Sequence, residues 1–177
     1  WFLLFNTTVS AQTYLAKANS GGDQTSILQA SFNDATVNTV LINSSDIIIN
    51  GTLNIPQGKM FRFENGFKLK GKGIINGGNY DVGYQQQIFD TSLTVNPRSV
   101  NQYFSVKWYG AKGVNTDDYD AIQKSINACI KNNIHVLYVP AGRYKISQPL
   151  IIRDADNSKT GNQRNFCTLE ILGESSF

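Results

Sequence analysis

The stretch FSVKWYGAKGVNTDDYDAIQKSINACIKNNIHVLYVPAGRYKIS, residues 104–147, decides the fold. It predicts a short strand, a glycine turn, one amphipathic helix, and two strands separated by a Pro-Ala-Gly corner. The helix is the clearest element, because apolar residues recur at helical spacing and form one stripe. The members of this stripe are Ile122, Ile126, Cys129 and Ile130.

Three aspartates, Asp117, Asp118 and Asp120, crowd the start of this helix. Carboxylates at that position accept hydrogen bonds from unpaired backbone N–H groups and meet the positive end of the helix dipole. Beyond the helix, His135–Val139 and Arg143–Ile146 are β-rich runs bounded by proline and glycine. The pattern therefore predicts a helix that leads into two strands.

Four segments of this stretch together resemble the opening motif of the pectate-lyase-like superfamily: Val106–Gly113, Thr116–Asp118, Ala121–Gln123 and Val139–Gly142. In that motif a "GAKGDG..DDT.AIQ.AI" segment leads into a "FPAG.Y" strand pair. The chain departs from it in having Asn115 where Gly is usual and Tyr119 where Thr is usual.

The resemblance implies an all-β fold, a right-handed single-stranded parallel β-helix (solenoid), over residues 101–177. It also implies that the helix is an N-terminal cap, which shields the open first coil of the β-helix from water. The superfamily includes polysaccharide hydrolases, pectate lyases, epimerases and phage tailspikes, so the motif is specific for the fold rather than for one reaction.

Residues 12–100 are expected to form a second, smaller module. The segment Asp23–Asn33 predicts a helix, with a face of Ile27, Leu28, Ser31 and Phe32 and a capping box of Ser26 with Gln29. Short β runs follow, and they suit the sides of a β-solenoid. These runs are Val40–Ile42, Ile47–Ile49, Thr52–Ile55, Met60–Phe63, Phe67–Leu69 and Gly73–Ile75. Corners are expected between them at Asn50-Gly51, Pro56-Gln57-Gly58, Asn65-Gly66, Gly71 and Asn76-Gly77-Gly78.

The two modules resemble each other at a nearly constant offset. Residues 26–30 parallel residues 120–124, residues 40–42 parallel 136–138, and residues 53–55 parallel 150–152. Chance similarity of common residue types is the alternative. The run from Ile55 to Gly71 also resembles a small solenoid that often precedes the superfamily motif. The polar segment Asp90–Gln102 is expected to link the modules, with the boundary near Asn101.

The start of the chain indicates export. An apolar run, Trp1–Phe5, is followed by Val9 and Ala11 in the small-residue pattern of a signal-peptidase site. Residues 1–11 are therefore interpreted as a signal peptide remnant, with a buried first strand as the alternative. No run approaches the roughly 18 apolar residues of a membrane span. The expected location is secreted, whether extracellular, periplasmic or at the cell surface.

Composition and charge narrow the classes of partner. Sixteen basic and thirteen acidic residues give a net charge of +3. These charges are scattered, which argues against nucleic acid as a partner. The cysteines Cys129 and Cys167 both fall in apolar segments. Two buried thiols are therefore favoured over the disulfide that export would permit.

No residue is assigned as catalytic, cofactor-binding or metal-binding, because a structural role is favoured for each candidate. A hydrolase of this kind needs two carboxyl groups across the sugar, about 6.5–9.5 Å apart for inversion. Asp117 and Asp118 are rejected as that pair, because helix capping explains both. Asp154 and Asp156, next to Arg153, could hold Ca²⁺, but a solvated loop is the favoured reading.

Four further candidates are also read as structural. His135 has no carboxylate or serine partner nearby in the sequence. Tyr103, Trp108 and Tyr109 could stack on a sugar, but entry residues of a solenoid core are favoured.

Taken with the resemblance, these observations predict the N-terminal part of a secreted enzyme that degrades acidic, pectin-like polysaccharide by hydrolysis or β-elimination. A non-catalytic β-helix for adhesion or glycan binding is the alternative, and a phage tailspike is disfavoured by the export signal. The strand-rich run Phe166–Gly173 near the end suggests a fragment whose active site lies downstream. Residues 12–177 alone are therefore expected to be inactive. No cofactor is expected, unless the full-length protein is a lyase that uses Ca²⁺.

Overall fold

The computed structural model describes residues 12–16, 22–98, 103–152 and 169–174 of the 177-residue chain. In this part the chain is rich in strands and has two α-helices and one short 3-10 helix. The first half contains β1 (Gln12–Ala16), α1 (Thr25–Asn33), β2 (Val37–Ile42), β3 (Ile47–Ile48), β4 (Thr52–Phe63), β5 (Leu69–Lys70), β6 (Ile74–Asp81) and β7 (Thr94–Asn96). The second contains β8 (Phe104–Ser105), η1 (Val106–Tyr109), β9 (Val114–Asp117), α2 (Tyr119–Lys131), β10 (Val136–Val139), β11 (Arg143–Lys145) and β12 (Glu170–Gly173).

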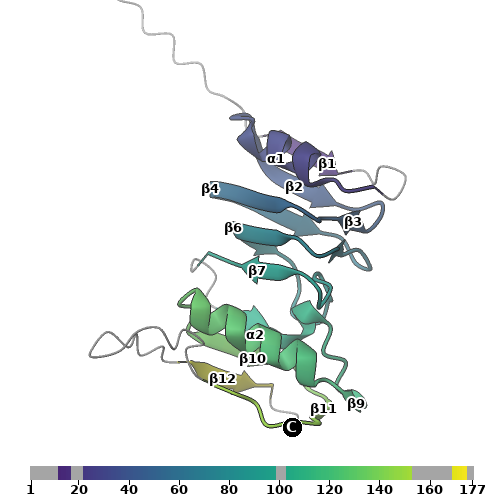
Figure 1. The fold of residues 1–177 in the computed structure, drawn as a ribbon, viewed down its shortest axis with the longest axis vertical. Helices are drawn as coiled ribbons and strands as arrows, with labels where there is room; N and C mark the ends of the chain where they lie inside the picture. Colours follow the sequence, from purple (N-terminus) through teal and green to yellow (C-terminus); the bar gives the residue numbers. More distant parts are fainter. Residues whose placement is uncertain (1–11, 17–21, 99–102, 153–168, 175–177) are drawn as a thin grey trace, which may run out of the picture.

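Every strand pair in the described ranges is parallel. The largest sheet has five strands in the order β1-β2-β4-β6-β7, and a second has three in the order β12-β10-β8. Two smaller sheets pair β3 with β5 and β9 with β11. In Figure 1 the strands β2, β4, β6 and β7 lie one below another, and α2, β10 and β12 follow beneath them.

In the first half, the chain returns to the same sheets at a regular interval. Thr52 pairs with Ile74, and Ile74 pairs in turn with Thr94. On another side, Ile47 pairs with Leu69, and Leu69 forms a bridge to Phe89. Each step therefore returns the chain to the same side after 20 to 22 residues.

Apolar side chains stack in columns along this repeat. Leu53, Ile75 and Val95 occupy matching positions on β4, β6 and β7, and each exposes 3% or less of its surface. A second column on the β3–β5 side is built in the same way from Ile47, Leu69 and Phe89. Because burying each such side chain contributes roughly 1.5–3 kcal/mol, these columns supply much of the driving force for stacking.

The core is continuous across the predicted module boundary near residue 100. Aromatic rings form a chain from the first half into the second, with centroid distances of 6.2 Å between Phe61 and Tyr80 and between Tyr80 and Trp108. Trp108 lies 4.8 Å from Phe104 on β8. The buried residues from Ala16 to Leu137 form one cluster, so the two sequence modules share a single core.

Helix α2 forms where the sequence predicts it. Ile122, Ile126 and Cys129 are buried as one stripe, and Ile130 packs partly against the core. The stripe faces η1, β8 and β10 of the second half and also β7 of the first. Its amphipathic pattern therefore buries one face at the level where the two halves meet.

Helix α1 confirms the predicted segment but corrects its details. Leu28 and Phe32 are buried, whereas Ile27 is 40% exposed. The predicted capping box is wrong, because the N-cap residue is Gln24 rather than Ser26, and the Gln24 side chain makes no capping bond. The Gln29 side chain instead bonds to Asn33 and to the backbone of Asn54, since the neighbouring strand offers both a donor and an acceptor.

Two predicted corners lie within strands. Pro56-Gln57-Gly58 was expected to separate two strands, but β4 continues through it. Its pairing with β6 shifts register there, so residues 56–59 lie opposite the single residue Gly78. The predicted corner at Asn76-Gly77-Gly78 is likewise part of β6. Extra residues in one strand are accommodated as a bulge, which bends the strand without ending its pairing.

The resemblance between the halves extends to their hydrogen bonds. In the first half, Gln29 Oε1 accepts from Asn54 N at 2.7 Å and its Nε2 donates to Asn54 O at 2.8 Å. In the second half, Gln123 makes the same two bonds with Ile151, at 2.8 and 2.9 Å. Each helix is thus fastened to a later segment by one amide that pairs with one backbone unit.

The residues before the two helices repeat a second arrangement. Asp23 Oδ1 accepts from the backbone N–H groups of Thr25 and Asn50, at 3.1 and 3.0 Å. Asp117 Oδ1 accepts from those of Tyr119 and Ser147, both at 3.2 Å. Equivalent residues of the two halves therefore make equivalent hydrogen bonds. This supports a shared structural plan for the two halves over chance similarity of common residue types.

Candidate functional site

The adjacent carboxylates Asp117 and Asp118 both bind backbone. Asp118 is 3% exposed, and its two oxygens accept from Lys112 N at 2.6 Å and Gly113 N at 3.0 Å. The capping interpretation is therefore wrong for Asp118, whose side chain bonds to the preceding turn and to no helix N–H. It holds for Asp117, which accepts from Tyr119, the first residue of α2.

Two of the aromatic candidates lie in the core. Trp108 and Tyr109 are 1% and 2% exposed, so their rings are not available for stacking on a sugar. Trp108 Nε1 donates to Gly83 O at 3.1 Å, and the Tyr109 hydroxyl accepts from Val95 N at 3.2 Å. Burial raises the pKa of the Tyr109 hydroxyl above its ordinary value. The core interpretation is confirmed for both residues.

The third aromatic candidate, Tyr103, belongs to a surface cluster that the sequence did not reveal. Its ring centroid lies 4.7 Å from that of Tyr84, and Tyr84 lies 4.9 Å from Tyr138. Tyr84 is 40% exposed. The pairing of β8 with β10 places Tyr103, directly before β8, beside the strand that holds Tyr138. A hydrogen bond from Ser105 Oγ to Tyr84 O, 2.6 Å long, holds Tyr84 beside β8. The rings are tilted against each other by 53–60°, so they form an edge-packed cluster rather than a flat platform.

Hydrogen bonds and burial shift the acidities of this tyrosine cluster. A hydrogen bond with Tyr84 is the main cause that raises the pKa of Tyr103 to about 12. Burial, with Glu174 nearby, raises the pKa of Tyr138. The hydroxyls of Tyr103 and Tyr138 are therefore protonated at neutral pH, and a sugar would meet them as hydroxyl groups rather than phenolates.

A shallow cleft of about 380 Å³ lies between two turns of the first half. It is lined by Asn65 and Gly66 of one coil and by Gln85, Gln86, Gln87 and Lys68. Amide groups of this kind can donate to and accept from sugar hydroxyls at once. Gln86 Nε2 donates to Glu64 O, which fixes one of these amides in place.

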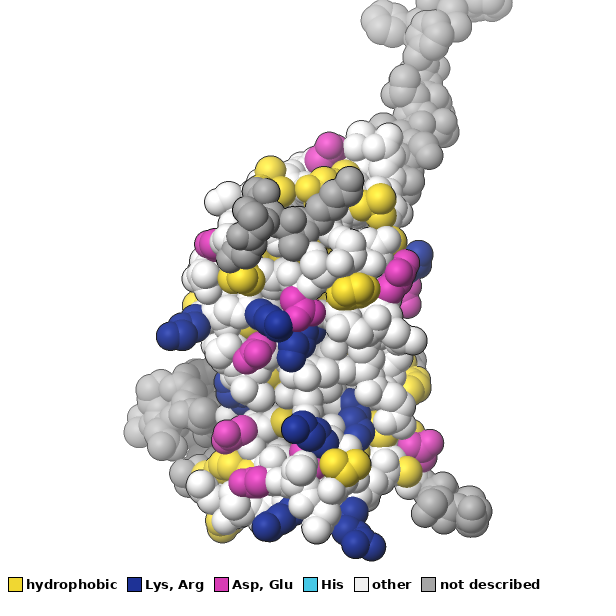
Figure 2. Space-filling model, turned by 90° about the vertical axis from the view of Figure 1, so that its right-hand side faces the viewer, with side chains coloured by type: hydrophobic (Ala, Val, Ile, Leu, Met, Phe, Trp, Pro, Cys, Tyr) yellow, Lys and Arg dark blue, Asp and Glu magenta, His cyan; other side chains and the backbone are white. Residues whose placement is uncertain are grey.

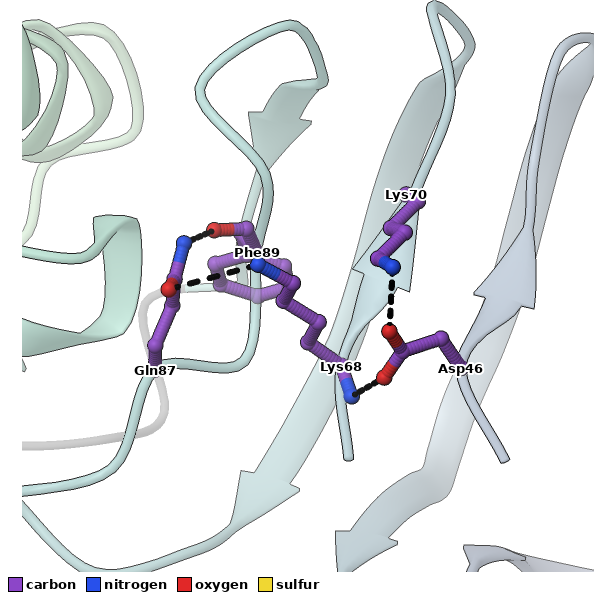
Figure 3. A network of polar contacts seen from close by, with 5 residues as sticks. All are labelled: Asp46, Lys68, Lys70, Gln87 and Phe89. Atoms are coloured by element: carbon purple, nitrogen blue, oxygen red, sulfur yellow. Dashed lines mark hydrogen bonds and ion pairs between the residues drawn. The ribbon is translucent and has the colours of Figure 1, made fainter. Parts of the chain in front are cut away.

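Polar contacts between neighbouring coils support one wall of this cleft (Figure 3). Lys70 Nζ pairs with Asp46 Oδ2 at 2.5 Å, and the other oxygen of Asp46 accepts from Lys68 N. Lys68 Nζ reaches Gln87 Oε1 at 3.4 Å, and Gln87 donates to Phe89 O. The hydrogen bond with Asp46 raises the pKa of Lys70. The contacts tie three coils together and leave the Lys68 ammonium at the cleft.

A second cleft, of about 200 Å³, lies between β7 and α2. Residues 93–96 form one wall, with Tyr109 beside them. Lys124, Asn127, Ala128 and Lys131 of α2 form the other wall. Neither cleft was predicted, because each is made by segments whose proximity depends on how the coils stack.

Of the remaining candidate site residues, some lie in the described part of the chain and others lie outside it. His135 is exposed and precedes β10, and its carbonyl accepts from Glu170 N at 2.7 Å. Cys129 is fully buried in α2, as predicted. Residues Arg153, Asp154, Asp156 and Cys167 lie outside the described part of the chain, as do residues 1–11. The calcium and cysteine-pairing expectations therefore stay predictions.

Charges of both signs are spread over the described surface. Basic and acidic side chains alternate over the face in Figure 2. Where the chain is described, no three His, Cys, Asp or Glu side chains gather into a group that could hold a metal ion. The described helices are also too short or too polar to cross a membrane.

Comparison with known families identifies one segment. Residues 103–165 match the family model described as "Rhamnogalacturonase A/epimerase, pectate lyase-like". The described part of this segment runs from β8 through η1, β9, α2, β10 and β11. No curated protein and no solved structure matches the chain.

Proposed function

We propose that the chain is part of a secreted carbohydrate-active enzyme that degrades acidic, pectin-like polysaccharide by glycosidic hydrolysis or β-elimination. The observation that carries the proposal is the family match over residues 103–165. It coincides with a segment in which every described strand pair is parallel. The match supports a carbohydrate-active family in general, and the acidic substrate, the reaction and the export are the proposal's own additions.

The proposal includes a finer view of the fold. The parallel sheets would be successive faces of a right-handed parallel β-helix, with α2 as its N-terminal cap. The 20- to 22-residue return of the first half and its apolar columns support this view. The contacts of α2 with η1, β8 and β10, the elements at the start of the second half, support the position of the cap.

The two reactions make different demands on side chains. Hydrolysis needs an acid and a second carboxylate on opposite sides of the glycosidic bond. β-Elimination needs a base at the C5 proton and a cation that stabilises charge developing on the uronate carboxyl group. Asp117 and Asp118 are both engaged by backbone N–H groups, so neither role is assigned to them.

Product analysis on purified polysaccharides tests the proposal. The complete protein would be incubated with polygalacturonate, rhamnogalacturonan and a neutral glucan, and new reducing ends and unsaturated products would be measured. The expected result is shortening of at least one acidic polymer and none of the glucan. Unsaturated products would indicate elimination, and reducing ends without unsaturation would indicate hydrolysis. Intact acidic polymers after prolonged incubation would contradict the proposal.

A non-catalytic glycan-binding role is the second candidate. The tyrosine cluster (Tyr84, Tyr103 and Tyr138) and the amide-lined cleft favour it, because both offer contacts to a sugar without a reactive pair. This candidate predicts retention of the protein on an immobilised polysaccharide with no products released. Cleavage of the retaining polysaccharide would rule it out in favour of the enzyme.

A further inference from the structure

The cleft between β7 and α2 is lined by polar groups that lack a protein partner. Lys124 and Lys131 form no ion pair or hydrogen bond with any residue that the structure describes, and the same is true of the Thr94 hydroxyl. Asn127 accepts from Gln123 at 2.9 Å, but its Nδ2 group has no acceptor in the described ranges. One narrow cleft thus presents two cations, an amide donor and a hydroxyl.

The two lysines are spaced along a single helix stripe. Lys124, Asn127 and Lys131 follow one another at intervals of three and four residues, so they project from the same side of α2. Seven residues of helix place the two lysine positions about 10 Å apart along the axis. Among the residues that the structure describes, none that lines the cleft is acidic. The cations are therefore not neutralised within the cleft itself.

The opposite wall of the cleft contains the last member of a row of hydrogen-bonded asparagines. Asn76 Nδ2 donates to Asn54 Oδ1 at 2.9 Å, and Asn96 Nδ2 donates to Asn76 Oδ1 at 2.8 Å. Asn96 borders the cleft, and its buried Oδ1 receives no hydrogen bond from the described residues. A buried acceptor left unpaired costs about 1–3 kcal/mol, so a donor at this end of the cleft would be favoured.

We propose that the cleft between β7 and α2 is an accessory binding site for a carboxylated sugar unit. This inference rests on the proposed function, since it takes the polysaccharide to be acidic. The sugar carboxylate pairs with Lys124 or Lys131, the hydroxyls bond to Thr94 and Asn127, and a small movement brings a hydroxyl to Asn96 Oδ1. The apolar floor of Leu93, Val95 and Ala128 accepts the ring. The site binds and positions the polymer and takes no part in bond cleavage.

Calorimetric titration of the complete protein with an oligouronate tests this site. The variants are Lys124→Gln and Lys131→Gln, and the matched control is Lys72→Gln, an exposed lysine outside the cleft. Because the carboxylate pairs with one of the two lysines, at least one cleft variant is expected to weaken binding about tenfold through the loss of a charge-assisted hydrogen bond. The control is expected to bind like the wild type. Thermal unfolding of each variant shows that the fold is intact.

Two further titrations fix the chemistry of the ligand. The fully methyl-esterified oligomer, which lacks the charge, is expected to bind at least tenfold more weakly than the free acid. Inorganic phosphate is expected to bind far more weakly than the oligouronate, because it offers no sugar hydroxyls to Asn127 and Thr94.

Several outcomes would overturn the site. Unchanged affinity in both cleft variants would place oligouronate binding elsewhere and leave the proposed function standing. Equal affinity for phosphate and oligouronate, lost in the cleft variants, would show a general anion site. Cleavage of polygalacturonate by a wild-type protein with no measurable oligouronate affinity would refute the accessory site alone. Neither binding nor cleavage of any acidic polymer would refute the site and the proposed function together.

Discussion

Gly71 occupies a backbone conformation that other residues rarely adopt. Its φ is +108°, and a Cβ built there would lie 2.2 Å from Ile49 O. Gly71→Ala is therefore expected to lower the free energy of unfolding by about 3 kcal/mol, because it combines backbone strain with a clash against backbone. Chemical denaturation would measure the loss. Gly83→Ala is the control, since no atom lies within 4 Å of its Cβ position, and a similar loss in both variants would contradict the explanation.

The ionisation of Asp117 makes the stability of the fold depend on pH. Hydrogen bonds from Ser147, with further bonds from backbone N–H groups, lower the pKa of this carboxyl below its ordinary value. Because its pKa is lower in the folded than in the unfolded protein, its ionised form stabilises the fold above about pH 4. That contribution is lost as pH falls through the folded pKa. The difference in Tm between wild type and Asp117→Asn is therefore expected to shrink from pH 6 to pH 3. A difference that does not change with pH would contradict this role.

At the residue scale, the sequence predicted where individual residues lie better than it predicted which groups they bond to. The aspartates at the start of α2 were expected, but the bonds of Asp118 to Lys112 and Gly113 were not. Those bonds exist because Gly113 has a φ of +66° and turns the chain back toward the carboxylate. The burial of Trp108 and Tyr109 agrees with their interpretation as entry residues of the core. The surface cluster of Tyr84, Tyr103 and Tyr138 could not be predicted, because it depends on contacts between segments that are distant in sequence.

The repeated amide clamps predict a matched pair of effects at the level of elements. Gln29 fastens α1 to Asn54, and Gln123 fastens α2 to Ile151, each through two hydrogen bonds. Gln29→Ala and Gln123→Ala are each expected to cost about 1–2 kcal/mol, because two partly exposed hydrogen bonds are lost in each case. Urea denaturation would compare them. Gln57→Ala, an exposed site in the bulge of β4, serves as the control.

A loss of stability in only one of the two variants, Gln29→Ala or Gln123→Ala, would contradict the equivalence of the two clamps. An equal loss in Gln57→Ala would show that the lost stability does not come from the clamp hydrogen bonds.

Substitution of two neighbouring isoleucines on β6 tests whether the apolar columns stabilise the fold. Ile75 is fully buried between Leu53 and Val95, whereas Ile74 points the other way and is 40% exposed. Ile75→Ala is expected to lower the free energy of unfolding by about 3–4 kcal/mol, and Ile74→Ala by less than about 1 kcal/mol. Denaturation midpoints would measure both. Comparable losses would mean that the strand is not packed as described.

At the element scale, periodicity predicted helices well and strand ends poorly. Helix α2 has a strong apolar stripe over 13 residues, which is long enough for the pattern to be unambiguous. Proline and glycine at residues 56–58 favoured a corner, yet β4 continues past them. Pairing with β6 on both sides holds the strand together across the bulge, and that tertiary support is invisible in local sequence.

At the scale of the whole molecule, the sequence indicated the repeated plan of the two halves but not their junction. Helix, strand and corner recur at a nearly constant offset, so a shared plan could be predicted. The rings of Phe61, Tyr80, Trp108 and Phe104 join the halves into one core, which depends on three-dimensional stacking. The clefts likewise arise between segments that only the stacking brings together, so sequence reasoning could not find them.

The central claim is that the two halves form one continuous stack. The most direct test follows unfolding by the fluorescence of Trp108 in a variant that is destabilised in the first half. Trp1→Phe leaves Trp108 as the single tryptophan of this sequence, so its fluorescence reports the junction, where Trp108 contacts Tyr80 of the first half and Phe104 of the second. Addition of Ile75→Ala in the first half is predicted to move the urea midpoint of Trp108 down by about 1–2 M, because a shared core unfolds as one unit. A Trp108 midpoint that is unchanged by Ile75→Ala would contradict the continuous stack.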